Sequence, residues 1–198
     1  GNSGPHETQY LAITEEYNGS SWTAGELMAA ADGRSGVRGC GTLTAGLAIG
    51  GARPGATPSY LAFVEEYDGT DWTAVTAIPS AIGAGMTAGT QTAALYAGGY
   101  TSPPATRHDE SYEYDGTNWT AGGDLLTGKS ASLSFQAGTQ TDAMHTGGSD
   151  GSATISKSEG YDGTSWSTRA NCTNAREDGA GAGTAALGLA AGKNTAPR

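Results

Sequence analysis

Residues in the connections between the expected strands could bind a ligand, because they combine flat aromatic rings with cationic or titratable side chains. Aromatic faces suit stacking on sugar rings, and arginine and lysine donate hydrogen bonds to hydroxyl, carboxylate and carbonyl oxygens. Variable loops on a rigid scaffold are frequent binding surfaces, although ordinary drift in solvated loops would give the same pattern. The candidate binding-face residues are Arg53, Tyr60, Tyr100, Arg107, His108, Lys157 and Arg169.

Tyrosine–tryptophan pairs are a second candidate for sugar stacking, and they recur four times along the chain. Each pair encloses an Asn-Gly or Asp-Gly dipeptide, which is the strongest short signal for a tight β-hairpin. Because the pairs recur in every unit, we interpret them as packing between neighbouring units rather than as a ligand platform. The eight residues are Tyr17, Trp22, Tyr67, Trp72, Tyr114, Trp119, Tyr161 and Trp166.

Catalytic and metal-binding patterns are missing from the sequence. The three histidines occupy non-equivalent positions, and none belongs to a spaced metal-binding pair. Asp68, Asp115 and Asp162 could coordinate a cation, but each begins an Asp-Gly turn, for which turn chemistry is the simpler explanation. Neither a nucleophile elbow nor a phosphate-binding glycine loop is present. We therefore expect no catalytic residues, no metal and no cofactor, and a protein that is not an enzyme.

The formal net charge of −10 argues against nucleic acid or an anionic membrane as a partner. No apolar run approaches the roughly 18 residues needed to cross a bilayer, so membrane insertion is not expected. We interpret Cys40 and Cys172 as small buried residues rather than as a disulfide, while three Asn-x-Ser/Thr sequences leave glycosylation open. These begin at Asn18, Asn118 and Asn171.

The elements that would position these residues come from an internal repeat. The tryptophans at positions 22, 72, 119 and 166 are 50, 47 and 47 residues apart, and a Gly-Thr segment of eleven residues moves in step with them. Within one unit, 82–88 and 93–97 resemble strands joined by a turn, 60–66 resembles a third strand, and the tryptophan lies on a fourth. The pattern predicts a four-stranded antiparallel meander repeated four times, typical of propeller blades.

The order of a glycine pair, a tyrosine often followed by aspartate, and a tryptophan resembles the kelch repeat. The form Gly-Thr-Gln-Thr-Ala-Ala at 89–94 is similar to kelch-like repeats of phage and environmental viral structural proteins. Arg34 and Arg176 match the family's arginine before the first strand, whereas counting seven residues back from the turn glycine gives Ile82 and Ala131 in the other units. The resemblance implies a β-propeller and names no ligand.

We therefore expect an all-β chain forming a single domain over 1–198, a four-bladed kelch-like β-propeller. The amino-terminal segment supplies only third and fourth strands, and the carboxy-terminal segment only first and second strands. Pairing of these terminal strands would close the ring within one chain, while pairing between chains would give a larger ring or an array. The expected blades are approximately 26–74, 76–121, 123–168, and 170–198 completed by 1–24.

For function, the sequence favours a non-enzymatic structural or adhesive module of a virion appendage, tail fibre or surface filament, located extracellularly or on a virion surface. The variable connections at 52–59, 100–109 and 149–156 would lie on one face and meet a protein or glycan partner, or another copy of the chain. A free lectin-like glycan-binding protein is the alternative, and an enzyme on the same scaffold is the second alternative.

Overall fold

The computed structural model describes residues 11–29, 33–53, 59–102, 105–134 and 138–192. These residues form sixteen β-strands and no helix, which confirms the expectation of an all-β chain. None of the described segments is a helix of the length and apolarity that crossing a membrane requires.

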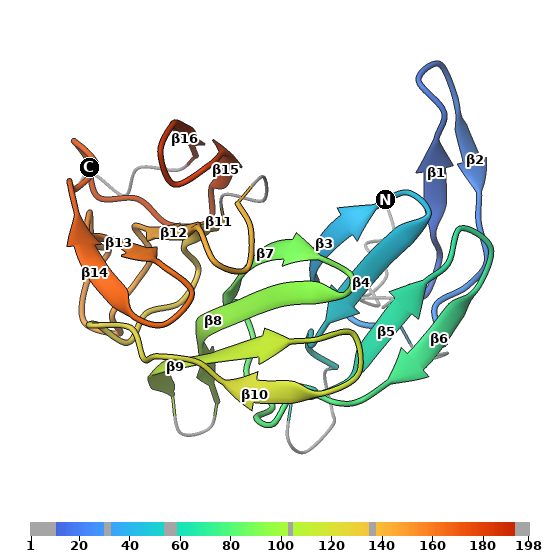
Figure 1. The fold of residues 1–198 in the computed structure, drawn as a ribbon, viewed down its shortest axis with the longest axis horizontal. Coiled ribbons are helices and arrows are strands. Elements are labelled where there is room, and N and C mark those ends of the chain that lie inside the picture. Colours follow the sequence, from blue (N-terminus) through green and yellow to red (C-terminus); the bar gives the residue numbers. More distant parts are fainter. Residues whose placement is uncertain (1–10, 30–32, 54–58, 103–104, 135–137, 193–198) are drawn as a thin grey trace, which may run out of the picture.

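The strands form three four-stranded antiparallel sheets and two separate hairpins, all paired in meander order (Figure 1). The N-terminal hairpin is β1 (Glu15–Tyr17) and β2 (Trp22–Ala24). Sheet I contains β3 (Arg38–Thr42), β4 (Ala45–Ile49), β5 (Val64–Tyr67) and β6 (Trp72–Val75). Sheet II contains β7 (Met86–Thr90), β8 (Ala93–Thr101), β9 (Thr106–Tyr114) and β10 (Trp119–Ala121). Sheet III contains β11 (Leu133–Ser134), β12 (Ala143–Thr146), β13 (Ser158–Tyr161) and β14 (Trp166–Arg169), and the C-terminal hairpin is β15 (Ala180–Gly183) and β16 (Gly188–Ala191).

The expected closure of the chain on itself is not present in the described residues. β1 and β2 pair only with each other, as do β15 and β16, so the two terminal hairpins do not form a common sheet. The first strands of successive units, β3, β7, β11 and β15, run beside one another and set the order of the sheets. In Figure 1 the three sheets form an arc, and the two terminal hairpins stand apart from each other on its open, upper side. A pairing that joins residues so distant in sequence is decided by packing rather than by local hairpin chemistry.

Each Asp-Gly turn is held by the aspartate side chain. In Asp68, one carboxylate oxygen accepts hydrogen bonds from the backbone N–H groups of Thr70 and Asp71, both at 2.8 Å. Asp115 and Asp162 do the same in their turns, and the amide oxygen of Asn18 replaces them in the first copy. This geometry explains the recurrence of aspartate without a cation.

These hydrogen bonds lower the pKa of the Asp68, Asp115 and Asp162 carboxyls below the ordinary value of 3.8. A carboxyl whose pKa is lower in the folded state stabilises the fold above its unfolded pKa, and this contribution is lost as the pH falls through the folded pKa. We expect the triple substitution D68N/D115N/D162N to be nearly neutral at pH 7 and to reduce the acid-induced loss of stability. Asn18 is the precedent, because it forms the same hydrogen bonds without titrating there.

Urea midpoints measured at neutral pH and at about pH 3 test this expectation. Asp71→Asn is the control, because it removes a charge from the same turn and keeps both hydrogen bonds to Asp68. A triple variant that loses as much stability in acid as the parent chain would show that these turns do not contribute to acid sensitivity.

The sheets pack on one another through tyrosines that reach back to the preceding unit. Tyr114 donates a hydrogen bond from its hydroxyl to Glu66 of sheet I at 2.9 Å, and Tyr161 donates to Glu113 of sheet II at 2.8 Å. Tyr67 forms the equivalent bond with Glu16 of the N-terminal hairpin. Burial, with a smaller contribution from Glu113, raises the pKa of the Tyr161 phenol to about 12. These phenols therefore remain neutral donors between the sheets.

The tryptophans and the turn glutamines add further connections between units. Each tryptophan ring lies against the tyrosine of its own hairpin, with ring centroids 4.8–5.1 Å apart. The indole N–H of Trp72 donates to the Thr14 hydroxyl at 3.0 Å. Gln140 of sheet III donates from one amide nitrogen to the backbone oxygens of Ala94 and Tyr114 in sheet II. Gln91 does the same from sheet II to sheet I. Each unit is therefore hydrogen-bonded to the unit that precedes it in the chain.

Candidate functional site

Three of the candidate binding-face residues, Tyr60, Tyr100 and Arg107, come together in the structure. The Tyr60 and Tyr100 rings meet edge to face, with centroids 4.9 Å apart and planes 64° apart. The Arg107 guanidinium carbon lies 4.8 Å from the centroid of the Tyr100 ring, within the range of a cation–π contact. We call these three residues the aromatic–arginine cluster.

A strand extension in sheet II positions the cluster. The connection expected at 100–109 is instead largely strand, since β8 runs to Thr101 and β9 begins at Thr106. Tyr100 and Arg107 are directly opposite each other in this extension. A bulge between Ala97 and Gly99 precedes it, and both glycines of the pair have positive φ, 64° at Gly98 and 113° at Gly99. The glycine pair thus permits the bend that the extension follows.

Tyr60 reaches the cluster from the connection between β4 and β5, where it bridges to Ala52. Its ring lies over Gly83, where a Cβ would fall 2.1 Å from a ring carbon, so no other residue fits there. Burial, followed by the hydrogen bond with Tyr100, raises the pKa of the Tyr60 phenol. A shallow hollow of about 180 Å³ lies beside the two rings, with Ser35 and Ala84 in its wall. The cluster therefore offers neutral aromatic edges and one cation to a ligand.

His108 follows Arg107 in β9 but has local partners of its own. One ring nitrogen lies 3.1 Å from the Thr101 hydroxyl and the other 3.0 Å from a Glu110 carboxylate oxygen. Consecutive strand residues point to opposite faces, so His108 is directed away from Arg107. The structure thus does not bring His108 into the aromatic–arginine cluster.

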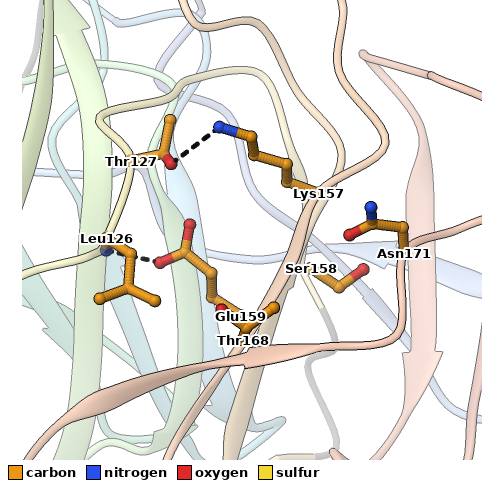
Figure 2. A pocket seen from close by; sticks show the side chains of 7 residues that line it. All are labelled: Leu126, Thr127, Lys157, Ser158, Glu159, Thr168 and Asn171. Atoms are coloured by element: carbon orange, nitrogen blue, oxygen red, sulfur yellow. Dashed lines mark hydrogen bonds between the residues drawn. The ribbon is translucent and has the colours of Figure 1, made fainter.

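Lys157 lines a second, separate pocket of about 220 Å³ at the edge of sheet III (Figure 2). Its ammonium group donates to the Thr127 hydroxyl at 3.3 Å. Across the pocket, Glu159 accepts a hydrogen bond from the backbone N–H of Leu126 at 2.7 Å. The pocket walls are mainly short side chains and one exposed amide, Asn171, which gives it few groups to orient a ligand.

The remaining two candidates, Arg169 and Arg53, lie apart from the aromatic–arginine cluster and from the Lys157 pocket. Arg169, in β14, donates to the Ser167 hydroxyl at 2.9 Å, and its guanidinium covers Gly160. Arg53 is partly buried near Arg34, whose pKa is lowered chiefly by burial and further by the charge of Arg53. The seven candidates therefore do not form one continuous face in the described structure.

Two buried ion pairs are the main feature that the sequence did not predict. In sheet I, Arg34 pairs with Glu65, and its other guanidinium nitrogen donates to the backbone oxygens of Gly50 and Phe63. In sheet III, Lys129 lies 3.1 Å from Glu159, with both side chains almost completely buried. Burial is the largest influence on both cations and lowers their pKa, while the carboxylates oppose it.

Lys129, not Ala131, occupies the position of Arg34 in its unit. Residues with positive φ mark the equivalent point just before each first strand, at Gly36, Ala84, Ala131 and Asp178. Two residues earlier lie Arg34, Ile82, Lys129 and Arg176. Counting seven residues back from the turn glycine gave Ala131, because sheet III has two additional residues between this cation and its turn glycine, Gly138. The Gly-Lys-Ser at 128–130 was the available signal for this cation.

His145 completes the buried group in sheet III. One ring nitrogen lies 3.0 Å from the Ser132 hydroxyl, and the backbone oxygen of His145 accepts a hydrogen bond from Lys129 at 3.2 Å. Burial, followed by the charge of Lys129, places the pKa of His145 well below 6.5. The group is therefore a neutral imidazole beside an ion pair, enclosed within the sheet rather than open to a substrate.

Metal-ligating residues do not gather in the described part of the chain, where no three His, Cys, Asp or Glu side chains could hold an ion together. Cys40 and Cys172 are free thiols, and burial raises the pKa of Cys40 to about 12. No protein-family model and no curated protein sequence matches this chain. The geometry of the described residues is thus the basis for a functional interpretation.

Proposed function

We propose that the chain is a non-enzymatic structural or adhesive module that presents the aromatic–arginine cluster to a protein or glycan partner. The carrying observation is the convergence of Tyr60, Tyr100 and Arg107 from two sheets into one contact group. Aromatic rings and arginine are the residue types that dominate binding energy at interfaces. Stacked aromatic edges beside a guanidinium also suit the apolar face and hydroxyl groups of a sugar ring.

The sheets suit such a role because they hold Tyr100 and Arg107 on paired strands, and Tyr60 in a connection that is bridged to Ala52. The kelch-like sequence pattern favours blades around an axis, with the two terminal hairpins as the halves of a fourth blade. A component of a virion appendage, tail fibre or surface filament, placed extracellularly or on a virion surface, would use this scaffold for both assembly and contact. A free lectin is the second candidate, favoured by the same cluster.

Binding to a glycan array, with Tyr100→Ala and Arg107→Ala as variants, tests the ligand role. We expect discrete glycan signals that fall about 30-fold or more in affinity when either residue is truncated, as for an interface hot spot. Arg169→Ala is the matched control, because Arg169 lies in β14, outside the cluster. An equal loss in the control, or consumption of a sugar substrate, would contradict the proposal.

The structural and free-lectin roles differ in oligomeric state. A structural module is expected to sediment as assemblies that grow with concentration, with a buried surface above roughly 1,000 Å² per contact. A free lectin is expected to stay monomeric while it binds glycans. A chain that neither assembles nor binds would contradict both.

A further inference from the structure

The terminal hairpins are the two missing halves of one sheet. In sheet I, Gly46 pairs with Tyr67 at the junction of the second and third strands. Gly46 also pairs with Gly41, as Gly188 pairs with Gly183 in the C-terminal hairpin. Tyr67 pairs with Trp72, as Tyr17 pairs with Trp22 in the N-terminal hairpin. Placing β16 beside β1 would therefore align Gly188 with Tyr17 and Ala190 with Glu15.

Apolar side chains are uncovered at both hairpins. Leu189 is 69% exposed, although Leu47 and Leu95, its counterparts in sheets I and II, are buried. At the other end of the chain, Trp22 is 66% exposed and Tyr17 is 47% exposed, whereas Tyr67, Tyr114 and Tyr161 are buried by the preceding unit. An exposed sheet edge with apolar residues on its faces is an association site.

The charges of the two hairpins are also complementary. In sheet I the buried ion pair joins Arg34 and Glu65, and Ala48 lies opposite Glu65. The equivalent residues across the two terminal hairpins are Arg176, Glu15 and Ala190, which are the same three residue types. Arg176 already donates to the backbone oxygen of Ala190 at 3.0 Å. Glu15 is exposed on β1.

We propose that the N-terminal hairpin of one copy takes up the C-terminal hairpin of a second copy of this chain, forming a four-stranded sheet with an Arg176–Glu15 ion pair. The C-terminal hairpin fits the N-terminal hairpin because its strand register matches that of the N-terminal hairpin and its arginine, Arg176, matches Glu15. A second copy is favoured over the chain's own hairpin because the two hairpins of one chain stand apart and do not pair with each other (Figure 1).

The resulting contact joins different surfaces of two identical chains. Such a head-to-tail contact produces a closed ring or an open filament, depending on the rotation between copies. In the joined assembly, sheet III of the neighbouring copy would also cover Tyr17 and Trp22. Sheet I covers Tyr114 in this way, and sheet II covers Tyr161. The assembly supplies the structural part of the proposed function and does not depend on the aromatic–arginine cluster.

A mixing experiment tests which chains supply the joined hairpins. In sheet I the turn residue Thr44 touches Gly69, so Ala186 would lie beside Gly19 in the joined sheet. Both native cysteines are first replaced in the full-length chain, as Cys40→Ala and Cys172→Ala. One version then carries Ser20→Cys, a second version carries Ala186→Cys, and the two bear tags of different mass. A third version carries both new cysteines. A short bismaleimide is expected to give the mixed dimer in preference to either like dimer. The proposal would be overturned if the third version formed only a link within one chain, or if the mixed dimer formed no more readily than the like dimers.

A charge exchange tests the ion pair. We expect Arg176→Glu and Glu15→Arg each to raise the dissociation constant of the assembly about 30-fold or more, because each leaves like charges at a buried contact. The double variant R176E/E15R is expected to restore assembly, and sedimentation over a concentration series measures both effects. Arg107→Glu, with the same charge change in sheet II, is the control that reports on the ligand cluster instead. Single variants that assemble like the parent, or no rescue, would overturn the ion pair.

Discussion

Trp166→Ala is expected to lower the free energy of unfolding by about 3–5 kcal/mol, the cost of removing a large aromatic side chain from a packed core. Trp166 is only 5% exposed and belongs to the apolar cluster between sheets II and III. Its ring lies 5.0 Å from Tyr161 and meets His145 edge to face at 6.1 Å, measured between centroids. Its indole N–H also donates to the Ser111 hydroxyl at 3.4 Å, so truncation leaves a cavity and removes one of the two hydrogen bonds of that hydroxyl, which still donates to the Gly123 backbone oxygen.

Trp22→Ala is the matched control for this loss. Trp22 occupies the same hairpin position and stacks on Tyr17 in the same way, but it is 66% exposed, and none of the described sheets precedes and covers it. We expect a change within about 0.5 kcal/mol, as for an exposed site, when unfolding in urea is followed by circular dichroism at a dilution that disfavours assembly. Comparable losses for the two variants would mean that burial between sheets does not explain the tryptophan repeat.

The hairpins were predictable from sequence because their chemistry is local. The Asp-Gly dipeptides fix turns whose hydrogen bonds lie within four residues, as in Asp68, and the same signal appears in every copy. Strand order followed, since a meander joins neighbours in sequence. Strand limits were less accurate: the expected strand 82–88 became Met86–Thr90, because Ile82 lies in the connection that carries the buried ion pairs in other sheets.

The features that the sequence did not predict depend on contacts between distant residues. Closure of the ring within one chain was predicted, but the described strand pairing does not show it, because closure depends on the relative positions of all the sheets, which no turn specifies. The register of Lys129 was misassigned because two additional residues lie before its turn glycine, and the backbone reveals them through the positive φ of Ala131 and the pairing of Ser130 with Ser149. Likewise, loop position alone grouped Arg107 with Lys157 and Arg169, while strand pairing places Arg107 against Tyr100.

Lys129→Met is expected to lower the free energy of unfolding by about 3–5 kcal/mol, because it leaves the buried Glu159 without its cation. Both side chains of this ion pair are almost fully buried, and Glu159 must also accept the backbone hydrogen bond from Leu126. Sheet II shows that the position does not require a charge. There Ile82 and Tyr112 stand in place of the cation and the carboxylate, and both are buried.

This precedent predicts that removing both charges is less damaging than removing one. In the double variant K129M/E159Q, a glutamine oxygen can still accept the Leu126 hydrogen bond, and no uncompensated charge remains in the sheet. We therefore expect the double variant to recover most of the single loss, with a coupling free energy of about 1–3 kcal/mol in a double-mutant cycle measured by urea unfolding. Additive losses would mean that Lys129 acts through packing of its methylene groups rather than through Glu159.

If the coupling is found, the cations at this position are interchangeable with apolar residues inside a complete sheet. The arginine retained at position 176, with its carboxylate partner on the other terminal hairpin, would then owe its charge to the joining of two halves rather than to the stability of either.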